Sequence, residues 1–92
     1  MPRVDSLTPV YVHFMPETLE EGKLYISKEF DIAIHLCPCG CGHKIRLILD
    51  PMYGWILTEH PEGDVSFTPS VGNFQIPCKT HYFIQHNKIV WC

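Results

Sequence analysis

Short apolar runs separated by turn residues recur along this chain, and several alternate between apolar and polar positions. This period of two is typical of strands that bury one face. The runs are bounded by turn-forming residues such as Asp50-Pro51 and Gln85-His86-Asn87. Strands are therefore predicted at residues 10–14, 23–26, 44–49, 54–58, 65–68, 81–84 and 88–91.

Residues 27–36 allow two interpretations. Ser27 has the chemistry of a helix N-cap, which would begin a short helix ending near Ile34. The alternation of Phe30, Ile32, Ile34 and Leu36 fits a strand equally well. Residues 69–77 are predicted as a loop. The pattern as a whole predicts a mainly β fold, a compact antiparallel sheet domain with at most one short helix.

Composition narrows the class of protein. The chain has 92 residues, of which 46% are hydrophobic, and this predicts one folded domain spanning residues 1–92. The net charge of −3 and the lack of a Lys/Arg cluster argue against nucleic acid or an anionic membrane as the main partner. No apolar run approaches the ~20 residues of a membrane span. The N-terminal residues lack the apolar segment of a signal peptide, so a cytoplasmic location is expected.

Four of the five cysteines lie in two separated clusters, Cys37-Pro-Cys39-Gly-Cys41-Gly-His43 and Cys78-Lys-Thr-His81. Thiolate and imidazole are the ligands that structural Zn²⁺ prefers, and four of them complete such a site. A zinc-stapled domain is therefore predicted. The favoured ligands are Cys39, Cys41, Cys78 and His81, with Cys37 as the next choice and His43 as a sixth candidate.

Two alternatives to zinc remain open at this point. Cysteine is among the most buried residue types, so the clusters could be packed free thiols. The order Cys41-x-His43 followed by Cys78-x-x-His81 also matches the ligands of a Rieske [2Fe–2S] centre. A Rieske centre would leave Cys37 and Cys39 without a role.

The sequence presents no evident catalytic constellation. No Ser/His/Asp triad, phosphate-binding loop or pair of acidic residues stands out along the chain. A catalytic zinc needs an open coordination position, whereas so many sulfur ligands predict a closed site. The residues alone therefore predict a protein that is not an enzyme.

Much of the chain resembles a known family. The resemblance is carried by LYIS (residues 24–27), HLCPCGCG (35–42), VSFTPSVGNFQIPCKTHYFI (65–84) and NKIVW (87–91). These segments resemble the BubL-like ubiquitin-like modifiers of bacterial ubiquitination-like (Bub) operons, formerly a domain of unknown function. The resemblance implies a ubiquitin-like domain that an E1-like enzyme adenylates at the Cys92 carboxylate. It also implies transfer to an E2-like protein and conjugation to target proteins.

The C-terminal tail departs from that family's expected chemistry. Ubiquitin-like tails usually end in a flexible Gly-Gly segment, whereas this chain ends in Val90-Trp91-Cys92. The first expectation is nevertheless a zinc-stabilised modifier with conjugation at Cys92. The alternatives are a zinc-stabilised interaction module without covalent chemistry and a Rieske-type electron carrier.

Overall fold

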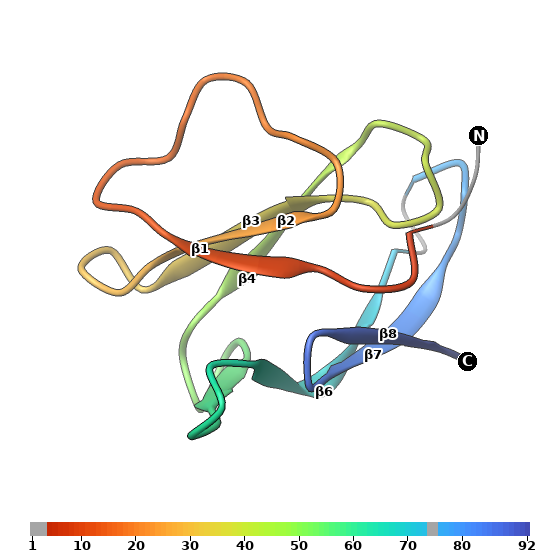
Figure 1. Cartoon of the computed structure of the whole chain (residues 1–92). Coiled ribbons are helices and arrows are strands. Elements are labelled where there is room, and N and C mark those ends of the chain that lie inside the picture. The colour runs from red at the N-terminus through yellow and green to blue at the C-terminus, as the bar shows by residue number, and fades with distance from the viewer. Residues whose placement is uncertain (1–3, 74–75) are drawn as a thin grey trace.

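The computed structural model describes residues 4–73 and 76–92, and within them the chain forms two four-stranded β-sheets and no helix (Figure 1). The first sheet contains, in spatial order, β1 (Thr8–Tyr11), β2 (Lys23–Ser27), β3 (Ile32–Leu36) and β4 (Lys44–Ile48). The second contains β5 (Ile56–Glu59), β6 (Val65–Gly72), β7 (His81–Gln85) and β8 (Lys88–Trp91). The prediction of a mainly β domain is confirmed. Among these described residues, nothing helical has the length and apolar character needed to cross a membrane.

In both sheets, neighbouring strands are consecutive in the sequence. β1 and β2 are parallel, and every other neighbouring pair is antiparallel. Of the two interpretations of residues 27–36, the strand is observed, because Ile32–Leu36 pairs with β2 on one side and β4 on the other. A turn with Asp31 at a φ of 53° precedes it. Pairing on both edges gives this segment more backbone hydrogen bonds than an isolated short helix would.

The hydrophobic core lies between the two sheets. Apolar side chains from alternate positions of each sheet meet there, as in other two-layer β proteins. The first sheet, with the segment before β1, contributes Leu7, Leu24, Ile26, Ala33, Ile45 and Leu47. The second contributes Val65, Phe67, Val71, Tyr82, Ile84 and Ile89.

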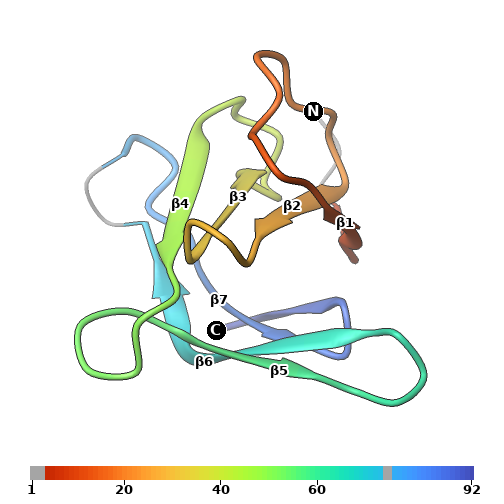
Figure 2. The same cartoon turned by 90° about the vertical axis from the view of Figure 1, so that its left-hand side faces the viewer.

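The connection from β4 to β5 carries the chain from one sheet to the other (Figure 2). Gly54 passes so close to β4 that an added Cβ would lie 2.1 Å from the carbonyl oxygen of Ile48. The backbone N–H of Trp55 donates to that same oxygen at 2.8 Å. Because residues 49–55 make this crossing, β5 begins only at Ile56 and pairs with β6 no further than Thr68.

β6 is longer than the sequence indicates. Residues 69–77 were expected as a loop, yet the strand continues through Pro69 to Gly72. A shift in the β6–β7 register between Phe67 and Val71 lets the strand pass the proline, which has no N–H to donate to a ladder. The loop prediction is therefore wrong for residues 69–72, while residues 74–75 lie outside the described part of the chain. The extension places Ser70 on a strand beside β7.

Candidate active site and metal centre

Four cysteine sulfurs converge at one end of the molecule. The Sγ atoms of Cys37, Cys39, Cys41 and Cys78 all lie within 4.8 Å of one another. Cys37 is 3.4 Å from Cys39 and 3.6 Å from Cys78, and Cys41 is 3.7 Å from Cys78. A zinc ion with Zn–S bonds of about 2.3 Å needs sulfurs about 3.8 Å apart at the corners of its tetrahedron. The four thiols are thus spaced to hold a metal ion.

Two loops bring these sulfurs together. The connection between β3 and β4 supplies three of them, and it is closed by the Cys37 N–H donating to the His43 carbonyl at 2.8 Å. Within it, Gly40 and Gly42 have φ values of 91° and 84°, a region that side chains with a Cβ rarely adopt. Cys78 arrives from the segment before β7, far along the chain.

The candidate ligands named from the sequence divide between this cluster and other places. Cys39, Cys41 and Cys78 lie in it, together with Cys37, whereas His81 is not among the grouped residues and contacts a serine instead. His43 Nδ1 lies 3.2 Å from the Cys41 sulfur. Which ligands bind a metal stays a prediction, but four cysteines alone already suffice for a tetrahedral site.

The thiols differ in acidity. Burial raises the pKa of Cys37 and of Cys39. At Cys78 burial also acts to raise the pKa, but hydrogen bonds from the Thr80 hydroxyl and backbone and from the neighbouring thiols lower it to about 6. Because burial disfavours the thiolate forms of Cys37 and Cys39, a cation beside them would stabilise those forms, which is the role that a bound metal would fill.

A buried polar network connects the cysteine cluster to the core. Thr80 Oγ1 lies 3.4 Å from the Cys37 sulfur, and Asn73 Nδ2 donates to Thr80 Oγ1 at 3.1 Å and to the Tyr82 hydroxyl at 3.4 Å. The Tyr82 hydroxyl lies 2.7 Å from His35 Nε2. The other ring nitrogen of His35 is buried without a partner in the described structure. Burial lowers the pKa of His35 to about 3, so its ring is neutral.

A serine and a histidine meet on the outer face of the second sheet. Val71 and Tyr82 pair across β6 and β7 and point into the core, so the adjacent Ser70 and His81 lie on the opposite face. Oγ of Ser70 is 2.6 Å from Nε2 of His81, and both residues are half-buried. The Trp55 indole N–H donates to the Ser70 carbonyl oxygen at 3.3 Å and so holds this part of β6.

A second serine–histidine contact lies near the start of β6. Ser66 Oγ is 2.8 Å from His60 Nε2, and it accepts the backbone N–H of His86 at 2.9 Å. The rings of His60 and His86 are stacked with centroids 4.0 Å apart, and His86 Nδ1 lies 2.7 Å from Asp64 Oδ2. Ser66 is thus tied to the turn between β7 and β8 as well as to a histidine.

Each contact has the geometry of a nucleophile beside a base. A serine hydroxyl is a weak nucleophile unless a neighbouring group takes its proton, and a neutral imidazole within about 3 Å can do so. Serine–histidine pairs of this kind recur in esterases and peptidases of unrelated folds, where geometry rather than sequence position identifies them. The outer face of the second sheet therefore carries two contacts with the geometry that serine hydrolases use, which no linear motif revealed.

Comparison with known protein families identifies the family to which this chain belongs. The family described as bacterial ubiquitination-like system serine protease (BubE) matches residues 11–92. The chain belongs to this family. Neither the curated proteins nor the solved structures give a match. The matched residues include both serine–histidine contacts and all four clustered cysteines, and membership implies protein partners within such a system.

The family membership corrects three expectations. The resemblance to Bub operon proteins points to the right system, but the assignment to its ubiquitin-like modifier (BubL) is wrong, because the matching family is a protease. The expectation of a protein that is not an enzyme is wrong for the same reason. The noncovalent interaction module and the Rieske carrier are not favoured either. The description of the domain as ubiquitin-like depended on the modifier resemblance and has no other support.

The sequence interpretation missed the pair for an identifiable reason. His81 was assigned to the metal because it follows Cys78 at ligand spacing, and Ser70 was assigned to a loop because of the prolines around it. The available signal was a polar Ser and a polar His next to the core positions Val71 and Tyr82. Had residues 70–72 been predicted as a strand pairing with 81–83, the two side chains would have been expected on one face.

Proposed function

We propose that this chain is a serine peptidase in which Ser70 is the nucleophile and His81 is the general base. The observation that carries this proposal is the 2.6 Å separation of Ser70 Oγ and His81 Nε2 on paired strands. Its half-buried position leaves the pair reachable from the outer face of the sheet. Membership of a serine protease family supports the same reaction class.

The two side chains can carry a complete hydrolytic cycle. With His81 neutral and protonated on Nδ1, Ser70 donates its proton to Nε2 as Oγ attacks the peptide carbonyl carbon. The C–N bond then breaks, and Nε2 returns the proton to the leaving amine. Water attacks the resulting ester, gives a proton to His81, and releases the carboxylic acid as Ser70 regains its hydrogen.

The hydrogen bonds of the two Oγ atoms favour Ser70 over Ser66 as the nucleophile. Ser66 Oγ accepts the His86 backbone N–H, so one of its two lone pairs is committed to the β7–β8 turn. Within the described part of the chain, the Ser70 Oγ contacts His81, while the Trp55 indole donates to the carbonyl of the same residue. A fixed backbone and an uncommitted lone pair favour attack, because reaction requires a narrow range of approach geometries.

The proposed metal is Zn²⁺, held by Cys37, Cys39, Cys41 and Cys78. Four sulfur ligands close the coordination sphere, so zinc would serve as a structural ion. Its contribution would be to fix the segment that leads into β7. Cys78 lies close before His81 in sequence, and Thr80 joins Cys78 by a 3.5 Å contact and Asn73 by a backbone hydrogen bond of 2.7 Å. The cluster thus holds the ends of β6 and β7 that carry the candidate catalytic pair.

A fluorophosphonate probe tests the nucleophile without knowledge of the substrate. Such probes react with activated serines, and the expected result is one adduct per chain, mapped to Ser70 by peptide mass spectrometry. Ser70→Ala and His81→Ala should abolish labelling, whereas the matched variant Ser66→Ala should label like the parent protein. Labelling that persists in Ser70→Ala and disappears in Ser66→Ala would overturn the assignment.

We further propose that the natural substrate is a polypeptide of the same ubiquitination-like system. The family description supports this, since it names the system in which the protease acts. Incubation with each protein of such a system, followed by intact mass measurement, would show which one loses a segment. Cleavage should require Ser70.

A further inference from the structure

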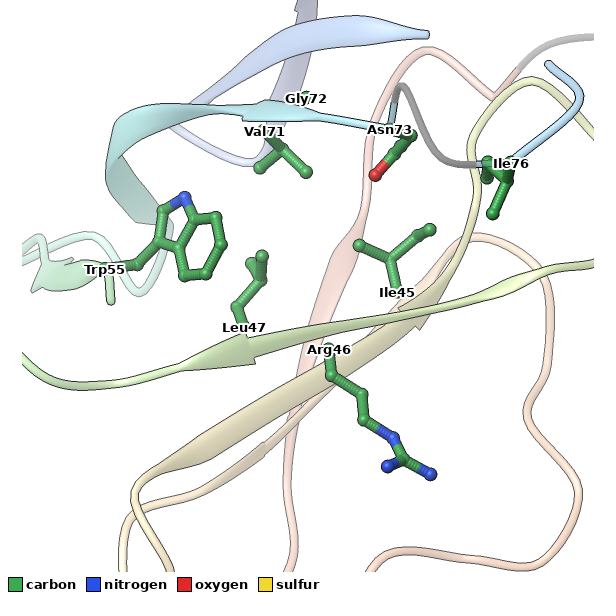
Figure 3. A pocket seen from close by; sticks show the side chains of 8 residues that line it. All are labelled: Ile45, Arg46, Leu47, Trp55, Val71, Gly72, Asn73 and Ile76. Atoms are coloured by element: carbon green, nitrogen blue, oxygen red, sulfur yellow. The ribbon is translucent and has the colours of Figure 1, made fainter. Parts of the chain in front are cut away.

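An apolar pocket opens between the two sheets, next to the strand that carries Ser70. Its volume is about 330 Å³, and it lies between β4 and β6. Figure 3 shows Ile45, Leu47, Trp55, Val71 and Ile76 directed toward this space, whereas the Arg46 side chain points away from it. Asn73 also lines the space and directs its side-chain oxygen toward it, so the lining is mainly apolar with one polar side chain.

Two strand edges frame this pocket. Among the residues that the structure describes, β4 is the outermost strand of its sheet and pairs only with β3. β6 has β5 on one side only as far as Thr68, so beyond that residue it pairs with β7 alone. The pocket therefore lies where the crossing from β4 to β5 leaves the β6 edge without a neighbouring strand.

Backbone groups of β6 point toward this edge. The Asn73 N–H donates to the Thr80 carbonyl at 2.7 Å, which makes these two residues a hydrogen-bonded pair of the antiparallel ladder. Hydrogen-bonded and non-hydrogen-bonded pairs alternate, so Gly72 opposite His81 is of the other kind. The N–H and C=O of Gly72 consequently face away from β7, toward the open edge.

The pocket is linked to the candidate catalytic residues through Trp55 and β6, although it lies on the inner face of that strand and Ser70 lies on the outer face. Trp55 forms one wall of the pocket and donates its indole N–H to the Ser70 carbonyl. Gly72, also in the pocket lining, follows Ser70 by two positions on the same strand. An occupant of the pocket would therefore be held within a few residues of the Ser70 hydroxyl.

We propose that the pocket is a specificity pocket for one apolar side chain of an extended substrate polypeptide, which hydrogen-bonds to the β6 edge at Gly72. This proposal rests on the proposed function of Ser70 and His81. An added strand is a common mode of peptide recognition, in which main-chain bonds give affinity and pockets for alternate side chains give specificity. Successive side chains of such a strand point alternately to the outer face, where Ser70 lies, and inward to the pocket.

The residues that line the pocket determine which class of substrate side chain it would accept. Ile45, Leu47 and Val71 are buried, and Trp55 and Ile76 are partly buried, so they offer no charged partner to an incoming group. Burying an unpaired charge there would be strongly unfavourable. Leucine, isoleucine, methionine or phenylalanine near the cleaved bond would be accepted, and aspartate, lysine or glycine would be rejected.

A library of tryptic peptides from a bacterial lysate, incubated with the full chain, tests this preference. Cleavage sites are read by mass spectrometry, and only those absent with Ser70→Ala are counted. We expect one position close to the cleaved bond to be enriched in apolar residues. For synthetic peptides made from an enriched sequence, replacing that residue by aspartate should lower kcat/KM at least tenfold.

Variants of the walls should change the preference in defined directions. Ile76→Asp should favour lysine or arginine at the selected position, and Val71→Ala, which enlarges the pocket, should favour phenylalanine over leucine. The matched control is Ile48→Asp, on the exposed face of β4 outside the pocket, which should leave the profile unchanged. Circular dichroism and zinc content verify that each variant is folded.

The possible results separate the two proposals. Ser70-dependent cleavage without an apolar preference, or with a preference that neither folded wall variant alters, would overturn the pocket and leave the catalytic assignment intact. If no peptide is cleaved in a Ser70-dependent way and the fluorophosphonate does not label Ser70, the proposed function fails, and the pocket proposal fails with it.

Discussion

Ser70 and His81 are diagonal neighbours on two paired strands, with Oγ of the serine 2.6 Å from Nε2 of the histidine although eleven positions separate them in sequence. The alignment depends on the β6–β7 register, in which Gly72 is opposite His81. A shift by one residue would turn either side chain to the opposite face. The geometry of the candidate site is therefore a property of strand pairing.

The first prediction concerns the nucleophile. Ser70→Ala should lower kcat by at least about 10³-fold, because residues that act as a catalytic unit each carry most of its effect. His81→Ala should cost a similar factor, and the double variant should be little worse than either single one. The measurement is cleavage of whichever protein of the system loses a segment in the intact-mass experiment.

Ser66→Ala is the matched control for that prediction. It removes the other hydroxyl of β6 that contacts a histidine, so it should weaken the β7–β8 turn while leaving kcat within about threefold of the parent value. Additive losses in the Ser70/His81 double variant would show that these two residues do not work together.

A second prediction addresses the metal. The purified chain should contain one zinc per molecule, and Cys78→Ser should lose it, because a missing thiolate opens a four-sulfur site. Since metal binding to such a site contributes of order 10 kcal/mol to folding, this variant should melt at a much lower temperature. Elemental analysis and thermal denaturation are the measurements.

Cys92→Ser serves as the control for the metal prediction. Cys92 is exposed at the end of the chain, outside the cysteine cluster, so this variant should retain zinc and its melting temperature. A stoichiometric content of iron instead of zinc would contradict the proposed ion. Retention of zinc by Cys78→Ser would contradict the proposed ligands.

The third prediction concerns Trp55. Trp55→Phe removes the 3.3 Å hydrogen bond to the Ser70 carbonyl and keeps most of the aromatic bulk. The free energy of unfolding should fall by about 1 kcal/mol, the usual net value of one hydrogen bond. Because the backbone of the nucleophile is then less constrained, kcat should fall roughly tenfold, as small displacements of reacting groups are costly. An unchanged kcat in a correctly folded variant would show that Trp55 does not position Ser70.

The fourth prediction concerns the buried pair His35 and Tyr82. Tyr82→Phe leaves His35 Nε2 without its 2.7 Å partner, while Nδ1 already has none in the described structure. Leaving a buried polar atom unpaired costs about 1–3 kcal/mol, so urea denaturation should show a loss of that size. The double variant with His35→Phe should recover part of the loss. If the two losses are instead additive, the residues are not energetically coupled.

Several features follow from the sequence without any structure. The alternation of apolar and polar residues determines most strands, since burial of one face requires a period of two, and the final hairpin is observed at 81–85 and 88–91. The cysteine clusters likewise indicate a metal centre, because thiols this dense are rare outside such sites. The Bub system was also indicated by the resemblance of whole segments.

Other features depend on long-range packing and could not be obtained from local pattern. Pro69 signals a break in β6, and only pairing with β7 after a register shift keeps residues 70–72 in the strand. Spacing in the sequence favoured His81 over Cys37 as the fourth ligand, whereas the fold places the Cys37 sulfur beside the other three and His81 beside Ser70. The candidate catalytic pair was hidden for this reason: the sequence by itself determined most strands and the cysteine clusters, whereas the serine–histidine contact exists only once β6 and β7 pair in the observed register.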